Sequence, residues 1–507
     1  MDTNTRIVVN TLAQHVRAIL NTCMSLFSTR YILMALGQSD FGIFSLIGST
    51  VAMLGFVTGA LVVTTQRHLS YSYGEGDREA SRQIFSNSLF IHILTAGVLI
   101  IVLAAIKPLL FGGILDINAD RIDTASRVYF IVLVMLGLSV VTSPFRALFV
   151  ARENIVYISI IDFLDGVFRL GLSIWLLFIN VDKLELYAWM MFGIAAFNLI
   201  AFAAYARMKF DDSCLWPRLS DIRKSIIAKI MNFAGWTVYS TGCILSRNQG
   251  LAIVLNSFFG TVVNAAYGIA LQVSSAVLYI SQGVINAMSP QIIKAEGEDN
   301  HQRTLMMTEK ACKYSFLLLS VPVIPICFEM PSILEAWLVD VPEGAVTICR
   351  FVLMAALIDH TTLALAIANQ ASGRIRNYSL LINTMKLLTL PMVVIILRMG
   401  GTTTSAMVCY ISVEAFCAML RLPYMKYSSG LKVRHFLSNV SIREISTIAS
   451  LAAVAYLCST YITIKWGFLV TLTLCSITGI AVIWLTAMTE QEKTAALEMV
   501  KRKKQKQ

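Results

Sequence analysis

The side chains with the clearest chemical potential in this sequence are basic residues that interrupt long apolar stretches. The six of them are Arg17, Arg30, Arg169, Arg247, Arg350 and Lys386. If those stretches cross a bilayer, one charge at the bilayer centre costs about 2.5–3.5 kcal/mol on insertion scales. Each cation is therefore expected to face the protein interior, to pair with an acid, or to extend its side chain to the membrane surface.

Three of these cations, Arg17, Arg30 and Arg247, have no acidic residue within a helical turn, and the apolar stretches around them contain no carboxylate. An arginine without a neighbouring acid is available to an anion, and its guanidinium group contacts phosphate through two parallel hydrogen bonds. We expect these three residues to bind an anionic, phosphate-bearing group. A cationic substrate is correspondingly disfavoured.

The remaining cations have candidate partners. Arg169 follows Asp165 by four residues, the spacing of an ion pair on one helical face. Lys386 is expected to pair with Glu414 in the next apolar stretch. Arg350 lies at the end of its stretch and is expected to reach the membrane surface.

Polar side chains form stripes on three of the apolar stretches, at spacings that place them on one helical face. The stripes are Arg6, Asn10, Gln14, Arg17, Asn21 and Ser28; Asn232, Trp236, Ser240, Cys243, Arg247 and Gly250; and Asn264, Gly268, Gln272, Ser275, Tyr279, Gln282 and Asn286. A stripe that runs along most of a span is too long for local helix–helix packing alone. We expect these faces to line a water-filled cavity.

Acidic residues and a histidine inside the stretches are candidates for coupling to H⁺ or Na⁺, namely Asp162, Asp165, Asp359, His360 and Glu414. A salt bridge or a buried hydrogen bond is an equally good interpretation of each. The sequence has no phosphate-cradling glycine loop, no zinc motif and no Ser/His/Asp arrangement placed for catalysis, so no catalytic residue, metal or other cofactor is expected. The ten cysteines are scattered without a CxxC pair and are interpreted as small buried apolar residues.

The elements that must position these residues are membrane spans. The 507-residue chain is 57% hydrophobic and 14% charged, with a mean hydropathy of +0.70. Soluble domains contain about 25% charged residues, so an ordinary soluble enzyme is excluded. Fourteen apolar runs follow, at residues 8–35, 41–65, 84–106, 127–149, 155–179, 184–206, 228–254, 262–288, 311–329, 345–369, 379–397, 401–422, 443–463 and 466–488.

The distribution of Lys and Arg between the runs predicts the orientation. With the N-terminus in the cytoplasm, the inside links and tails contain 29 of the 41 basic residues, the outside links contain six, and six lie within spans. Cytoplasmic loops carry the excess of Lys and Arg, so both termini are predicted to be cytoplasmic. The net charge of +11 is explained in this way, without nucleic acid as a partner.

The predicted organisation is all-helical, with two related six-helix lobes and two further helices. Residues 1–207 form the first lobe, 208–226 a cytoplasmic linker and 227–425 the second lobe. Two additional spans occupy 426–489, and 490–507 is a basic cytoplasmic tail expected near anionic lipid headgroups. Weak internal similarity supports the repeat, because Arg30 precedes Gly42 by about the distance at which Arg247 precedes Gly260.

The chain resembles the MOP (multidrug/oligosaccharidyl-lipid/polysaccharide) flippase superfamily. The resemblance is carried by the fourteen spans and by the local sequences at Phe41-Gly42, 256–260 (NSFFG) and 265–268 (AAYG). Within this superfamily the chain is most similar to bacterial polysaccharide-transport proteins, the O-antigen (Wzx-like) flippases. This resemblance implies a MATE-like fold whose two lobes open alternately to the two membrane faces. It also implies a location in the bacterial inner membrane and an undecaprenyl-pyrophosphate-linked oligosaccharide as substrate, moved for O-antigen, capsule or exopolysaccharide synthesis.

The resulting hypothesis is a flippase in which Arg17, Arg30 and Arg247 bind the pyrophosphate. Asn21, Gln272 and Asn286 would donate hydrogen bonds to sugars, and Tyr279 would offer a stacking face. Membrane lipids and polysaccharide polymerase or chain-length proteins would be its partners. One alternative is a MATE-type exporter of drugs coupled to H⁺ or Na⁺. Another is a membrane-embedded glycosyl transferase, which is disfavoured because its longest outside link, roughly 107–126, is short.

Overall fold

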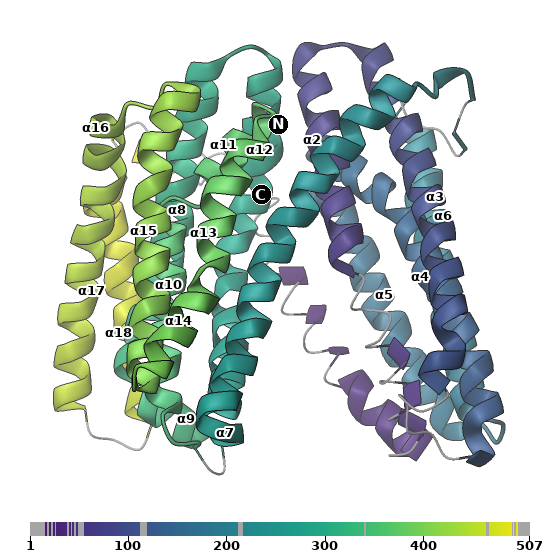
Figure 1. The fold of residues 1–507 in the computed structure, drawn as a ribbon, viewed down its shortest axis with the longest axis horizontal. Coiled ribbons are helices and arrows are strands. Elements are labelled where there is room, and N and C mark those ends of the chain that lie inside the picture. The colour runs from purple at the N-terminus through teal and green to yellow at the C-terminus, as the bar shows by residue number, and fades with distance from the viewer. Residues whose placement is uncertain are drawn as a thin grey trace, which may run out of the picture. The chain divides into compact units, whose positions relative to one another are not determined.

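The regular secondary structure is entirely helical in the residues that the computed structural model describes (Figure 1). These are residues 16–17, 20–21, 24–25, 27–37, 40–41, 43–44, 47–48, 55–111, 119–210, 216–217, 219–338, 341–462, 466–488, 490 and 493–494. Gly42 and almost all of the predicted basic tail 490–507 lie outside them. In these ranges the chain forms one helix after another with short connections, as its nearly continuous apolar runs predict.

The helices before residue 297 are α2 (Gly55–Glu75), α3 (Arg78–Leu109), α4 (Ile122–Ala151), α5 (Ile155–Trp175), α6 (Lys183–Lys209) and α7 (Lys224–Gly297). They are followed by α8 (His301–Phe328), α9 (Met330–Trp337), α10 (Ala345–His360), α11 (Leu365–Ala371), α12 (Ile375–Tyr378), α13 (Thr384–Leu387), α14 (Thr389–Arg398), α15 (Thr403–Ser429), α16 (Val433–Phe436), α17 (Ile442–Tyr461) and α18 (Gly467–Val482). Short π-helical turns η5 (Ser379–Asn383) and η6 (Leu437–Ser441) join α12 to α13 and α16 to α17.

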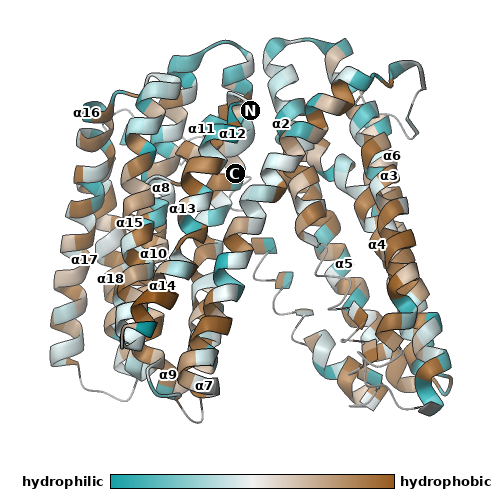
Figure 2. Cartoon of the chain, in the orientation of Figure 1, coloured by the Kyte–Doolittle hydropathy of each residue, from teal (hydrophilic) through white to brown (hydrophobic). Residues whose placement is uncertain are grey.

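Nine helices of the described ranges are long and apolar enough to cross a membrane, and a tenth span results if α10 and α11, bent by 46°, count as one. Each of these ten coincides with one of the predicted apolar runs. Apolar residues dominate the middle of the long helices and hydrophilic residues gather at their ends (Figure 2). The chain is therefore built as a multi-pass membrane protein.

Four predicted spans are not among these ten. The run 155–179 corresponds to α5, and 228–254 to the first part of α7; both are helical but carry the polar side chains discussed below. The runs 8–35 and 41–65 lie partly outside the described residues. The count of fourteen therefore remains a prediction.

The helix α7 contains a break at Gly260, one of the glycines singled out in the sequence. Its backbone has φ 80° and ψ −173°, a conformation essentially restricted to glycine, and helices continue on both sides of it. The second helix, Val262–Gly297, is a candidate span of its own. Gly260 thus divides a 74-residue helix into two elements.

The chain divides into two compact units. The N-terminal unit comprises the described residues of 8–238 with Gly297–Asp299, and the C-terminal unit those of 239–296 and 300–507. The division falls within α7 rather than in the predicted linker 208–226, part of which lies outside the described residues. The predicted domain boundaries remain predictions.

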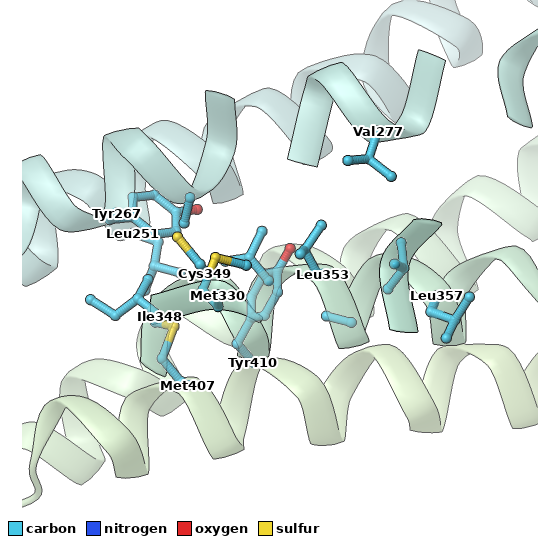
Figure 3. Close-up of a cluster of buried hydrophobic side chains, with 14 of the residues drawn as sticks. Leu251, Tyr267, Val277, Met330, Ile348, Cys349, Leu353, Leu357, Met407 and Tyr410 are labelled. Atoms are coloured by element: carbon cyan, nitrogen blue, oxygen red, sulfur yellow. The ribbon is translucent and has the colours of Figure 1, made fainter. Parts of the chain in front are cut away.

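Each unit has its own apolar core. In the N-terminal unit, the central helix α4 buries residues toward α3 and α6, among them Tyr129, Phe145 and Phe149. In the C-terminal unit one large cluster joins α7, α8, α10 and α15, and it includes Tyr267, Leu353 and Tyr410 (Figure 3). The additional helices α17 and α18 pack on α8 and contribute Leu451, Ala455 and Cys475 to the same cluster.

Candidate functional site

The N-terminal unit contains an ion cluster around Asp162 of α5. Arg17 Nη1 donates a hydrogen bond to Asp162 Oδ2 at 2.7 Å. Arg146 of α4 donates two more, from Nη1 to Oδ1 at 2.7 Å and from Nη2 to Oδ2 at 3.0 Å. No acid lies within a helical turn of Arg17, as the sequence shows, but its partner Asp162 lies 145 residues later in the sequence.

One helical turn further along α5, Asp165 forms the pair that the spacing predicts. Arg169 Nε donates to Asp165 Oδ2 at 2.6 Å. Asn198 of α6 donates from Nδ2 to Oδ1 of the same carboxylate at 2.7 Å. The predicted Arg169–Asp165 pair is confirmed, and the same carboxylate ties α5 to α6.

The N-terminal cluster has a positive accessible charge. We define this cluster as Arg17, Arg146, Arg169, Asp162 and Asp165. The two carboxylate side chains are only 18% and 19% exposed, whereas those of Arg146 and Arg169 are 36% and 49% exposed. Three guanidinium groups face two carboxylates, so the cluster carries one excess positive charge. The carboxylates orient the guanidinium groups and leave their remaining N–H donors available to an anion.

Asn21 lies beside this cluster. Its buried Oδ1 has no hydrogen-bond partner among the described residues. A Cβ added to Gly166 of α5 would lie 3.2 Å from that oxygen, so Asn21 approaches α5 closely because residue 166 has no side chain. Arg30 is exposed, and the described part of the chain offers it neither an ion pair nor a side-chain hydrogen bond.

The C-terminal unit contains a second and more deeply buried network. Arg247 of α7 and Lys386 of α13 both pair with Glu414 of α15, and the Lys386 Nζ–Glu414 Oε2 distance is 2.9 Å. Lys386 Nζ also lies 2.8 Å from Asp359 Oδ1 of α10, and Arg421 Nη2 lies 2.7 Å from the same oxygen. The predicted Lys386–Glu414 pair is confirmed.

Arg247, which has no acid within a helical turn, is paired with an acid from another helix. Its side chain is 6% exposed, its Nη1 donates to Glu414 Oε1, and its Cζ lies 5.0 Å from the ring centroid of Tyr410. Tyr410 belongs to the apolar core of this unit (Figure 3). Arg247 is thus enclosed by an acid and an aromatic ring, and an anion would have to displace Glu414 to reach it.

The candidates for ion coupling are all hydrogen-bonded. Asp162 and Asp165 are held by arginines, and Asp359 and Glu414 by the cations just described. His360 lies 3.0 Å from Ser281 Oγ through Nε2 and 2.9 Å from the carbonyl of Ala356 through Nδ1. A Na⁺ ion or proton at any of the four carboxylates would compete with a cation already in contact.

The polar stripe predicted on the second helix of α7 lies on an exposed face. Gln272, Tyr279 and Asn286 are exposed, and Gln282 Nε2 donates to Asn286 Oδ1 at 3.0 Å. The opposite face buries Ala266, Tyr267, Ala270 and Val277 in the core of the C-terminal unit. An apolar span therefore presents amide and phenol groups away from the core of its own unit.

Two arginines of these clusters are not among the candidates that the sequence provides. Arg146 and Arg421 both lie near the cytoplasmic ends of apolar runs, and this position inside the runs is the signal that identifies them. Glu444, at the start of α17, has no comparable signal, because nothing in the sequence shows that it is buried. In the described residues no group of three or more His, Cys, Asp or Glu side chains is arranged to hold a metal ion.

Comparison with known proteins gives a clear answer for the fold. No family model matches the chain, and no curated protein matches it in sequence. A crystal structure of a MATE point mutant matches with a TM-score of 0.72 at 14% identity, over 86% of this chain and 98% of that one. The chain has the MATE fold.

Two further solved structures agree. An outward-facing multidrug resistance MATE family transporter of the MOP superfamily matches with a TM-score of 0.69 at 14% identity, over 86% of this chain and 97% of that one. A MOP superfamily transporter from Pyrococcus furiosus also matches, with a TM-score of 0.68 at 15% identity, over 86% of this chain and 97% of that one. Its binding pocket is described as having reverse polarity. The superfamily expected from the sequence is thus that of the structural neighbours, and the Wzx-like subtype remains a proposal.

Proposed function

We propose that this protein is a transporter that flips an undecaprenyl-pyrophosphate-linked oligosaccharide across the bacterial inner membrane by alternating access. The observation that carries the proposal is the accessible positive charge of the N-terminal cluster, where Arg146 and Arg169 are about twice as exposed as the carboxylates that orient them. Guanidinium groups held in this way suit the oxygen atoms of a pyrophosphate. A cationic drug would be repelled by the same groups.

The contacts in the structure change which residues are assigned to the pyrophosphate, compared with the assignment from the sequence. Arg17, Arg146 and Arg169 are the candidates in the N-terminal unit, and exposed Arg30 remains one. Arg247 instead stabilises the C-terminal unit through Glu414. Asn21, next to the cluster, is assigned to the sugars instead, because its unpartnered Oδ1 can accept a hydrogen bond from a hydroxyl group but not from a phosphate oxygen.

The exposed face of α7 is the proposed contact for the sugars. Gln272 and Asn286 offer amide donors and acceptors to sugar hydroxyls, and Tyr279, whose surface is 49% exposed, offers an apolar ring face. These groups lie on the exposed side of a span whose other side is packed in an apolar core. Such a face is suited to a hydrated head group that passes through the membrane while its lipid tail stays in the bilayer.

Export of drugs coupled to H⁺ or Na⁺ is the second candidate, and the likeness to a multidrug resistance MATE transporter favours it. The Pyrococcus furiosus protein is a MOP superfamily transporter whose binding pocket has reverse polarity, which suggested a different function for it. Pocket polarity is thus the property that separates the two candidates here. The net positive charge of the N-terminal cluster favours an anionic substrate.

The test compares two substrates in vesicles that contain the purified full-length protein. One is a fluorescent undecaprenyl-pyrophosphate-linked sugar, and the other is a cationic dye under a proton or sodium gradient. We expect the lipid-linked sugar to change leaflets at a rate well above that of protein-free vesicles and the dye to stay in place. Export of the dye without movement of the lipid would overturn the proposal in favour of the drug exporter.

The same vesicles test the assignment of residues. Arg169→Ala removes an exposed guanidinium and leaves Asp165 hydrogen-bonded to Asn198. Arg127→Ala is the matched control, because Arg127 also pairs with an acid, Glu185 at 2.8 Å, but lies outside the cluster. Flipping should fall in the first variant and persist in the second.

A further inference from the structure

The carboxyl group of Glu444 is enclosed where α17 packs against α8. Glu444 is the third residue of α17, and only 2% of its surface is exposed. It belongs to the buried stripe of that helix, which consists of Glu444, Thr447, Leu451, Ala455 and Cys458. The helix enters this position from the π-helical turn η6, an irregularity that is often associated with functional positions.

Glu444 differs from the other buried acids of the C-terminal unit. Asp359 and Glu414 contact permanent cations, and Glu329 accepts a hydrogen bond from Thr471 Oγ1 at 2.8 Å. Glu444 has no hydrogen bond or ion pair with any described residue, and its Oε1 is a buried atom without a partner. A carboxylate anion is not retained in such surroundings, since burial of an unpaired charge is far more costly than burial of the neutral acid.

The titratable groups on the packed elements do not supply a counter-charge. On α8, Cys312 is a buried free thiol. Glu309 of α8 and His435 of α16 pair with each other at 3.2 Å. Lys313 of α8 is buried, with its Nζ 4.8 Å from the ring centroid of Tyr314, and Arg443 precedes Glu444 on α17. None of these groups forms an ion pair with Glu444.

We propose that Glu444 is a proton-binding site, which holds one proton while α17 is packed on α8. The ligand is H⁺, bound as the neutral carboxylic acid. The acid releases its proton when its oxygen atoms gain access to water, because the anion is then solvated. Protonation of Glu444 and packing of α17 on α8 therefore stabilise one another.

This site provides a route by which protons couple to transport. The carboxylates singled out in the sequence are each occupied by a cation, whereas Glu444 can gain or lose a proton without breaking an ion pair. The coupling role of Glu444 rests on the proposed function as a transporter. Proton binding by Glu444 is independent of that function, so the two claims are tested separately.

Infrared spectroscopy of the purified full-length protein tests proton binding directly. The C=O stretching band of a protonated carboxylic acid in an apolar site should be present at neutral pH and should disappear in Glu444→Gln, which has the shape of the neutral acid. The control Glu329→Gln, another buried acid of the same helix group, should retain the band assigned to Glu444. If Glu444→Gln does not fold, Glu444→Asp keeps the acid and should shift the band. An unchanged spectrum in the folded variant overturns the proposal.

Transport tests the coupling. The rate of lipid flipping in the vesicle assay is measured across a range of pH and with an imposed proton gradient. Glu444→Gln should flip without a response to the gradient, while Glu329→Gln should respond like the wild type. A normal response in Glu444→Gln contradicts the coupling role even if the infrared band is lost. If the wild-type protein moves no lipid, the proposed function fails and the infrared result still decides the proton site.

Discussion

Arg247 of α7 and Glu414 of α15, separated by 167 residues in the sequence, form a nearly solvent-free ion pair at the centre of the C-terminal unit. Lys386 shares the same carboxylate and connects it to Asp359, which also holds Arg421. Five charged side chains from α7, α10, α13 and α15 are thus joined in one network. A buried charge is tolerated when all of its partners are in place, so this network fixes how those helices pack.

The first prediction concerns removal of one partner. Glu414→Gln leaves Arg247 buried without an anion, which typically costs about 3–5 kcal/mol. Unfolding of the purified protein in detergent should show a markedly lower Tm than the wild type. The control Glu185→Gln breaks an exposed pair with Arg127, worth about 0–1 kcal/mol, and should change the Tm little. Equal effects of the two substitutions would show that the Arg247–Glu414 pair is not buried.

The second prediction concerns the anion-binding arginines. Arg146 donates two hydrogen bonds to Asp162, and Arg17 continues to hold that carboxylate when Arg146 is removed. Arg146→Ala removes the proposed hydrogen bond from Arg146 to the pyrophosphate, and loss of a hydrogen bond to a charged group costs about 1.5–3 kcal/mol. The substitution should therefore reduce flipping about 10-fold to 100-fold. Arg127→Ala should stay within twofold of the wild type. Flipping by Arg146→Ala at the wild-type rate would remove Arg146 from the site.

The sequence predicts much of the fold because its main signals are local. Span length, hydropathy and the distribution of Lys and Arg are properties of consecutive residues, and ten of the apolar runs coincide with spans of the described chain. The partners of Arg17 and Arg247 are not local, since Asp162 and Glu414 belong to other helices far along the chain. Spacing within one helical turn identifies Asp165 as the partner of Arg169, but it carries no information on the partners of Arg17 and Arg247.

Burial is the second property that the sequence does not provide. Arg30 and Arg247 both lie in apolar runs without a carboxylate. Arg30 is nevertheless exposed, whereas Arg247 is buried. Glu444 follows a basic residue near the start of an apolar run and has the pattern of a surface acid. Only the packing of α17 on α8 shows that its carboxyl is enclosed.

The third prediction concerns a close backbone approach in the N-terminal unit. A Cβ on Gly297, the last residue of α7, would clash with the backbone carbonyl oxygen of Tyr71 in α2. Because a backbone atom cannot move aside as a side chain does, Gly297→Ala should destabilise the protein by about 1–3 kcal/mol, as overpacking does. Gly193→Ala in α6, where nothing lies within 4 Å of the new Cβ, should be neutral or slightly stabilising. Thermal unfolding of both variants checks the contrast, and a stable Gly297→Ala would contradict the close approach of Gly297 to Tyr71.

The fourth prediction concerns the exposed face of α7. Gln272 and Tyr279 do not contribute to the core, and substitution of exposed residues usually changes stability by about 0.5 kcal/mol or less. Gln272→Ala and Tyr279→Ala should therefore keep the wild-type Tm and should slow the flipping of a lipid with a long oligosaccharide more than one with a single sugar. Equal slowing of both lipids would argue against contacts with the sugars.

The measurement that tests the central claim most directly compares two lipids that differ only in charge. The rate at which the reconstituted protein flips an undecaprenyl-pyrophosphate-linked sugar is compared with that of an undecaprenyl-linked sugar without phosphate. The account predicts that the wild-type protein moves the charged lipid much faster and that the double variant Arg146→Ala/Arg169→Ala loses this preference. Equal rates for the two lipids in the wild-type protein would contradict the claim that the cationic cluster of the N-terminal unit recognises the pyrophosphate.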